Sequence, residues 1–224
     1  GIYYEDITFR GILFDSSYLC GGLFIVDSAR IRINNCFFLH FATEGIKVQS
    51  GHETFISNCF LGQHSTVGGD KGERQFSGTA IELSSNDNAI TDVAIFSAAI
   101  GITVRGQANM ITGVHCYNKA TVMEDPIQVH VTNGFFLGDA NIVLKSIKGK
   151  IYGLNIVNNM FSGNPNNNVP IVALDGKFSN IDQVVIDRNN VIGMRLRSTI
   201  GKLNVDVVES EKPVYGVVSF FVEQ

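Results

Sequence analysis

The segment Gly45-Ile46-Lys47-Val48-Gln49-Ser50-Gly51-His52-Glu53-Thr54-Phe55-Ile56-Ser57-Asn58-Cys59-Phe60-Leu61 contains, one after the other, the two strand patterns from which the chain is built. The pattern at its start is a small residue followed by Ile-x-Val. The pattern at its end is an apolar strand that closes with Asn and a bulky residue. Both alternate apolar and polar side chains with a period of two, which is typical of β-strands.

Both patterns recur along the chain, and successive Ile-x-Val strands fall roughly 20 to 35 residues apart, the range expected of a solenoid. The Ile-x-Val pattern returns at residues 80–83, 101–104, 141–144, 171–174 and 193–196, and the Asn pattern at residues 33–38, 131–136, 157–161 and 188–192. The chain has no long helical stripe, and its Asn133-Gly134 pair lies inside a repeat, which argues against antiparallel hairpins. We therefore predict one all-β domain over residues 1–224, a right-handed single-stranded parallel β-helix of about eight coils.

The recurrent Asn residues are interpreted as turn residues rather than as ligands. Asn tolerates the left-handed backbone conformation, and its amide can bond the backbone of the next coil. The residues assigned to these turns are Asn35, Asn58, Asn133, Asn159 and Asn190. The four cysteines contain no CxxC pair, so buried thiols are favoured over a disulfide framework. Cys36 and Cys59 are expected to stack as thiols, and a bridge between them is sterically conceivable.

Composition excludes several classes of protein. The formal net charge is −4, from 21 acidic and 17 basic residues, whereas a nucleic-acid binder shows a basic face. The apolar runs are too short for a membrane-spanning helix. The sequence begins at Gly1 without a charged and then apolar leader, so no signal peptide is visible.

One strand is missing from the repeat. After residues 111–117 an Ile-x-Val strand is expected, but residues 118–125 lead directly to Ile127-Gln128-Val129-His130-Val131, which fits the Asn pattern. We therefore expect that about one coil is absent near residues 121–124, and that the connection there skips a strand.

Several longer strings resemble the plant polygalacturonases of the Quartet type. These are Gln-Ser-Gly-His-Glu-Thr at 49–54, Phe-Leu-Gly-Gln-His at 60–64, Gly-Asp-Lys-Gly-Glu-Arg at 69–74, Asn-Asp-Asn-Ala-Ile-Thr-Asp at 86–92, Gly-Gln-Ala-Asn at 106–109, Gly-Val-His-Cys-Tyr-Asn-Lys-Ala at 113–120 and Phe-Phe-Leu-Gly-Asp at 135–139. The resemblance covers most of the chain. It implies a pectin-lyase-like β-helix, secretion to the cell wall, cleavage of α-1,4-galacturonan and a role in the release of pollen from tetrads.

The chain also departs from that family. Members have a further coil before the Glu-Asp-Pro stretch and an N-terminal region with a leader, so the resemblance implies a fragment or a splice variant truncated at its N-terminus. The Asn-Thr-Asp, Asp-Asp, Gly-His-Gly and Arg-Ile-Lys motifs of the broader pectin hydrolases do not stand intact here. No catalytic residue is therefore transferred from those motifs.

Substrate binding is predicted on the outward positions of the Ile-x-Val strands. The cations that gather at these positions are Lys47, Arg105, Lys145, Arg195 and Arg197. A basic strip suits a polyuronate, because Arg can grip a carboxylate with two bonds. The chain has no Trp, so Tyr117 is the candidate for stacking on a sugar ring. The alternative is a solvated sheet face without a ligand.

Hydrolysis of a glycosidic bond normally needs two carboxyl groups. The candidates are Glu82 on a strand, Asp70 and Glu73 in the longest insert, residues 63–78, and Asp87 in the following turn. His52 and His64 are further candidates for the acid or base. Ordinary surface or turn positions are the alternative for each of these residues.

Three functions stay open on the sequence: a pectin-type hydrolase, a non-catalytic or inactive carbohydrate-binding β-helix, and a β-eliminating lyase. No set of His, Cys, Asp or Glu has metal-ligand spacing, so we predict neither a metal nor another cofactor. The expected partner is a galacturonan polysaccharide, without nucleic acid or membrane, and the expected state is a monomer.

Overall fold

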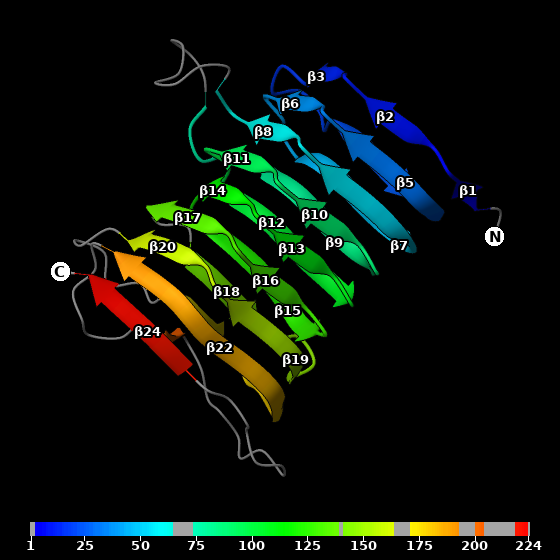
Figure 1. The fold of residues 1–224 in the computed structure, drawn as a ribbon. Helices are drawn as coiled ribbons and strands as arrows, with labels where there is room; N and C mark the ends of the chain where they lie inside the picture. Colours follow the sequence, from blue (N-terminus) through cyan, green and yellow to red (C-terminus); the bar gives the residue numbers. More distant parts are fainter. Residues whose placement is uncertain are drawn as a thin grey trace.

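The computed structural model of the chain describes residues 3–64, 74–138, 141–163, 171–192, 200–203 and 218–223. Within these ranges the secondary structure consists of strands joined by turns and bends, without a helix. Every strand pairing there is parallel. Figure 1 shows the coils stacked from the blue N-terminal strands to the orange and red strands β22 and β24. The prediction of an all-β parallel β-helix of about eight coils is confirmed.

Each coil contributes one strand to each of three parallel sheets. The first sheet holds the strands with the Asn pattern: β2 (Thr8–Arg10), β5 (Ser28–Asn34), the second half of β7 (Glu44–Ser57), β10 (Ala89–Thr91), β13 (Met110–Thr112), β16 (His130–Thr132), β19 (Lys150–Val157) and the first part of β22 (Asn180–Ile192). The short strand β1 (Tyr4–Glu5) pairs with the start of β5.

The second sheet follows after a tight turn. It comprises β3 (Leu13–Asp15), β6 (Phe37–Leu39), β8 (Phe60–Gly62), β11 (Ala94–Phe96), β14 (His115–Tyr117), β17 (Phe135–Gly138), β20 (Met160–Gly163) and the end of β22, and β24 (Val218–Glu223) stacks on β22.

The third sheet holds the Ile-x-Val strands. It comprises β4 (Leu23–Val26), the first half of β7, β9 (Thr79–Asn86), β12 (Ile100–Gln107), β15 (Ala120–Ile127), β18 (Asn141–Lys145), β21 (Val172–Asp175) and β23 (Ile200–Leu203). Lys47, Glu82, Arg105 and Lys145, four of the candidate functional residues, lie on the outer side of this sheet.

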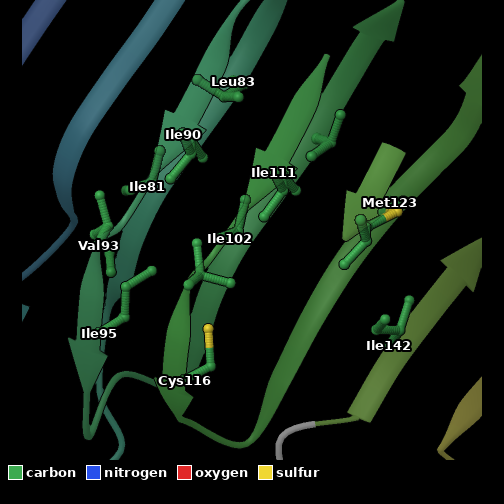
Figure 2. Close-up of a cluster of buried hydrophobic side chains, with 14 of the residues drawn as sticks. Ile81, Leu83, Ile90, Val93, Ile95, Ile102, Ile111, Cys116, Met123 and Ile142 are labelled. Carbon is green, nitrogen blue, oxygen red and sulfur yellow. The ribbon is translucent and has the colours of Figure 1, made fainter. Parts of the chain in front are cut away.

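The core is a set of inward columns that run through successive coils. In the first sheet the column is in register from coil to coil and fully buried; it consists of Ile33, Ile56, Ile90, Ile111, Val131 and Ile156. Figure 2 shows Ile90 and Ile111 of this column together with Ile81 and Ile102 from the third sheet. Burial of each such side chain contributes about 2 kcal/mol, so neighbouring coils stabilise one another.

The turn between the first and second sheets places one residue per coil in the left-handed conformation. Asn35, Asn58 and Asn133 have φ of 52°, 52° and 55°, as predicted. In two later coils the predicted residue is wrong by one or two positions. Asn158 has φ 58° in place of Asn159, and Arg188 has φ 51° in place of Asn190.

The displaced assignment has a physical reason, because Asn159 occupies the next, inward position of the coil. Its Oδ1 accepts a hydrogen bond of 2.8 Å from the Gly134 N–H, and its Nδ2 donates to the Val131 carbonyl at 2.9 Å. Asn189 repeats the arrangement one coil later and accepts 2.9 Å from the Asn159 N–H. The predicted amide contacts between coils therefore exist, but they are made by the buried side chains of Asn159 and Asn189 rather than by the turn residues themselves.

The expected skipped strand near residues 121–124 is wrong. Residues 120–127 form β15, which pairs in register with β12 on one side and with β18 on the other. Its inward residues are Thr121 and Met123, both buried, and they do not match the Ile-x-Val pattern. Continuous pairing of this kind is also the geometry expected if a complete coil were removed, so the absence of one coil relative to the family stays a prediction.

All four cysteines are thiols. Cys36, Cys59 and Cys116 are buried, and the Cys36 N–H donates to Cys59 Sγ at 3.4 Å, as a thiol stack requires. Burial raises the pKa of Cys59 to about 11 and that of Cys116 to about 12. Cys20 is exposed. The prediction of buried thiols is therefore confirmed for Cys36, Cys59 and Cys116 and wrong for Cys20.

Candidate functional site on the third sheet

Two columns of side chains point outward from the middle of the third sheet. The first column contains Lys47, Glu82 and Thr103, which are aligned on β7, β9 and β12. The second column contains Gln49, Ser84, Arg105, Glu124 and Lys145, aligned on β7, β9, β12, β15 and β18. Alternation along each strand turns these polar residues outward while the Ile and Val neighbours enter the core.

The charged members of the two columns form a ladder of ion pairs that alternates in sign along the axis. Lys47 Nζ lies 3.6 Å from Glu82 Oε1, and Arg105 Nη1 lies 2.9 Å from the same oxygen. Arg105 then binds Glu124 with two bonds, Nε to Oε2 at 2.7 Å and Nη2 to Oε1 at 3.3 Å. Lys145 Nζ follows at 3.9 Å from Glu124 Oε1. We call these five residues the charge ladder.

The charge ladder corrects the predicted basic strip. Lys47, Arg105 and Lys145 do share the outer face, but Glu82 and Glu124 stand between them and pair with them. The pKa of Arg105 is raised above its usual range, chiefly by the hydrogen bonds to Glu124 and then by Glu82, against the opposing effect of burial. This part of the face is therefore close to neutral rather than basic. Arg195 and Arg197 lie outside the described residues.

Glu82 and Glu124 form a carboxylate pair on either side of Arg105. Their side chains are 13% and 16% exposed, whereas that of Arg105 is 41% exposed. Since both are bonded to one planar guanidinium, their bonded oxygens are at most about 8 Å apart. That limit is compatible with the roughly 6.5–9.5 Å between the carboxyls of inverting glycosidases. Sequence reasoning missed Glu124 because it treated residues 121–124 as a junction instead of a strand.

An open groove of about 480 Å³ lies beside the charge ladder, at the ends of β9, β12 and β15. Its lining residues are Asn86, Arg105, Gly106, Gln107, Glu124, Asp125, Ile127, Ile147 and Lys148. Amide, charged and aliphatic groups thus meet in one concavity, the mixture that sugar rings with hydroxyl and C–H surfaces require.

Asp125 builds one wall of this groove. Its φ of 43° turns the chain at the end of β15, and its carboxylate accepts backbone N–H bonds from Ile147 at 3.2 Å, Lys148 at 2.6 Å and Lys150 at 3.1 Å. From the next coil Ser179 and Asn180 donate their N–H groups to the Gly149 carbonyl, at 2.9 and 3.0 Å. The loop of residues 146–149 is therefore fixed by the coils on both sides.

The remaining predicted catalytic residues do not join this pair. Asp87 is an exposed turn residue with φ 57°, the backbone role that Arg30 and Glu53 have in earlier coils. His52 lies at the corner between the third and first sheets, with Nδ1 3.4 Å from a Glu53 carboxylate oxygen. His64 is buried after β8, 6.3 Å from the Phe96 ring.

Tyr117 and the acidic insert residues also lie away from the charge ladder. Tyr117 is on the second sheet, where its ring stacks on Phe96 at 4.9 Å and lies 5.6 Å from Phe76. It is therefore not placed to stack on a sugar at the third sheet. Asp70 and Glu73 fall outside the described residues.

Among the described residues no three His, Cys, Asp or Glu side chains are grouped so as to hold a metal ion. In the same part of the chain no helix is long and apolar enough to cross a membrane.

Comparison with known proteins finds a similar plant protein. The chain is 49% identical over 236 residues to Polygalacturonase QRT3 of Arabidopsis thaliana, a match that takes in 91% of the chain and 49% of the relative. The chain thus spans about half the length of the curated relative it matches. No family model matches the chain, and no solved structure does. The resemblance to a plant polygalacturonase that was seen in the sequence is confirmed.

Proposed function

We propose that the chain is the β-helical part of a pectin-type glycoside hydrolase that acts on α-1,4-galacturonan. The observation that carries this proposal is the 49% identity to a polygalacturonase over 91% of the chain. The chain covers only half of that relative, so the proposed activity depends on residues that this chain itself contains. Secretion to the plant cell wall and a monomeric state belong to the same proposal.

In the proposed reaction Glu82 and Glu124 share the acid and base roles. One carboxyl donates its proton to the glycosidic oxygen as the C–O bond breaks. The other accepts a proton from the water whose oxygen bonds to the anomeric carbon. A carboxyl that carries a proton must first give up its ion pair with Arg105, so substrate binding has to rearrange the charge ladder. Arg105 holds both carboxyls on the outer face until then.

The second candidate function is non-catalytic carbohydrate binding. The specific observation in its favour is that Arg105 already engages the carboxylates of both Glu82 and Glu124, so neither is free to meet a substrate. A third reading, a β-eliminating lyase, differs in its products. Hydrolysis gives saturated ends, elimination gives unsaturated ends that absorb in the ultraviolet, and a binder gives neither.

The proposal is tested by incubating the chain with de-esterified polygalacturonate and measuring reducing ends and ultraviolet absorbance. We expect reducing ends without absorbance, and no reaction on neutral glucans. Glu82→Gln and Glu124→Gln should each lower the rate by about 10²-fold or more, since each removes one proton-transfer group. Asp87→Asn is the matched control, because it makes the same chemical change at an exposed turn. Equal rates in all three variants would contradict the assignment of the carboxylate pair.

A further inference from the structure

Two cations line the groove beside the charge ladder, Arg105 and Lys148, and they differ in whether they have an ion-pair partner among the described residues. Arg105 lines it, but its Nε, Nη1 and Nη2 groups are bonded to Glu124 and Glu82. An incoming carboxylate has to displace one of these partners to reach Arg105. Lys148 lines the same groove and forms no ion pair or side-chain hydrogen bond with any residue that the structure describes.

The backbone of Lys148 is held in a fixed place. Its N–H donates to Asp125 Oδ2 at 2.6 Å, and Asp125 follows directly on Glu124 in the chain. Ser146 Oγ donates to the Lys177 carbonyl, and Gly149 accepts from Ser179 and Asn180. An ammonium on a loop fixed from two coils loses less conformational entropy on binding a ligand than one on a free loop.

The surroundings of Lys148 define the kind of ligand. Ile147, next to it in the chain, is 58% exposed, and Ile127 is partly exposed on the same groove. Asn86 and Gln107 supply amide groups there. A ring with an apolar C–H face, hydroxyl groups and one carboxylate matches all three kinds of group.

We propose that Lys148 is the residue that selects an acidic over a neutral sugar, by receiving the carboxylate of a uronate ring bound next to the Glu82–Glu124 pair. This inference rests on the proposed function and adds a specificity-determining residue to it. It also replaces Arg105 in the uronate-binding role expected from the sequence. Arg105 instead positions the two carboxyls.

The test is calorimetric titration of the chain with a short oligogalacturonate and with the same oligomer after methyl esterification, at low ionic strength. Lys148→Gln should weaken binding of the acidic oligomer about fivefold, the upper end for an exposed ion pair, and leave the esterified oligomer unaffected. Lys148→Arg should retain the affinity of the parent chain. Lys150→Gln is the matched control, because its N–H also bonds Asp125 while its side chain does not line the groove.

The outcomes separate this inference from the proposed function. If the parent chain binds the acidic oligomer and Lys148→Gln binds it equally well, the role of Lys148 is overturned and the proposed function stands. The role is also overturned if Lys150→Gln weakens binding as much as Lys148→Gln does. If the parent chain neither binds nor cleaves oligogalacturonate, the proposed function fails and the inference fails with it.

Discussion

Replacement of Arg105 by Ala tests whether the charge ladder holds the outer face of the third sheet together. The change removes the three contacts of 2.7, 2.9 and 3.3 Å to Glu82 and Glu124, which leaves both carboxylates without their shared partner. Both carboxylates are mostly covered, at 13% and 16% exposure, so water replaces the guanidinium incompletely. They then repel each other across at most about 8 Å, which amounts to about 2 kcal/mol at an effective dielectric constant of 20.

The expected net loss of folding free energy is smaller than the sum of the lost ion pairs and the new repulsion. Half-exposed ion pairs contribute up to about 1 kcal/mol each, and relaxation of the two side chains relieves part of the repulsion. We expect Arg105→Ala to lower the free energy of unfolding by about 2 kcal/mol. For a chain of this size the midpoint of thermal unfolding should fall by about 4–8 °C, as measured by circular dichroism.

Two controls make the result interpretable. Lys47→Ala, at the edge of the charge ladder, breaks only contacts of 3.5 Å or longer and should cost at most about 0.5 kcal/mol. A double-mutant cycle between Arg105→Ala and Glu124→Gln should give a coupling of about 1 kcal/mol. If Arg105→Ala costs no more than Lys47→Ala, the charge ladder is an exposed surface feature and the reasoning is wrong.

Three further predictions concern other parts of the fold. Asn159→Ala should destabilise the chain by about 3 kcal/mol in thermal unfolding, because it removes the partner of the buried Gly134 N–H and of the Val131 carbonyl. Asn35→Ala, at a turn, should cost about 1 kcal/mol. Equal costs would contradict the role of the buried Asn side chains. The pKa of Asp15 lies below its usual range because of the Ser17 N–H and His40, so its stabilisation is present above about pH 4 and lost as the pH falls further. Asp15→Asn should therefore flatten the acid limb of stability against pH, and an unchanged limb would refute this. At pH 8 iodoacetamide should label exposed Cys20 and leave Cys116, whose pKa is about 12, unmodified in the folded chain; labelling of both would contradict the buried thiol.

The pairing within the charge ladder could not be predicted from the strands taken one at a time. Alternation predicted correctly that Lys47, Glu82 and Arg105 point outward from the third sheet. It did not predict that Glu82 would stand between the two cations and pair with both. That pairing depends on the register between coils, which no residue specifies alone. The predicted strip of like charge is thus a ladder of alternating charges once the coils are stacked.

The fold class was predictable from the amino-acid sequence alone. The strands alternate with a period of two, they recur at the length of one coil, and Asn stands at the bends. Together these features predict a parallel β-helix, because each coil must bury its inward Ile and Val against its neighbours. The resemblance to plant polygalacturonases was also visible in the sequence, since strings such as Gly-Val-His-Cys-Tyr-Asn-Lys-Ala at residues 113–120 are long enough to be specific.

The tertiary structure alone decided which residues meet. Residues 120–127 lack the Ile-x-Val pattern, and they form a strand because β12 and β18 offer unpaired backbone on both sides. That pairing turns Glu124 outward beside Arg105 and brings Asp125 to the loop that presents Lys148. Local sequence encodes the alternation of a strand, but the contacts across coils depend on residues 19 to 23 positions apart, and only stacking brings these together.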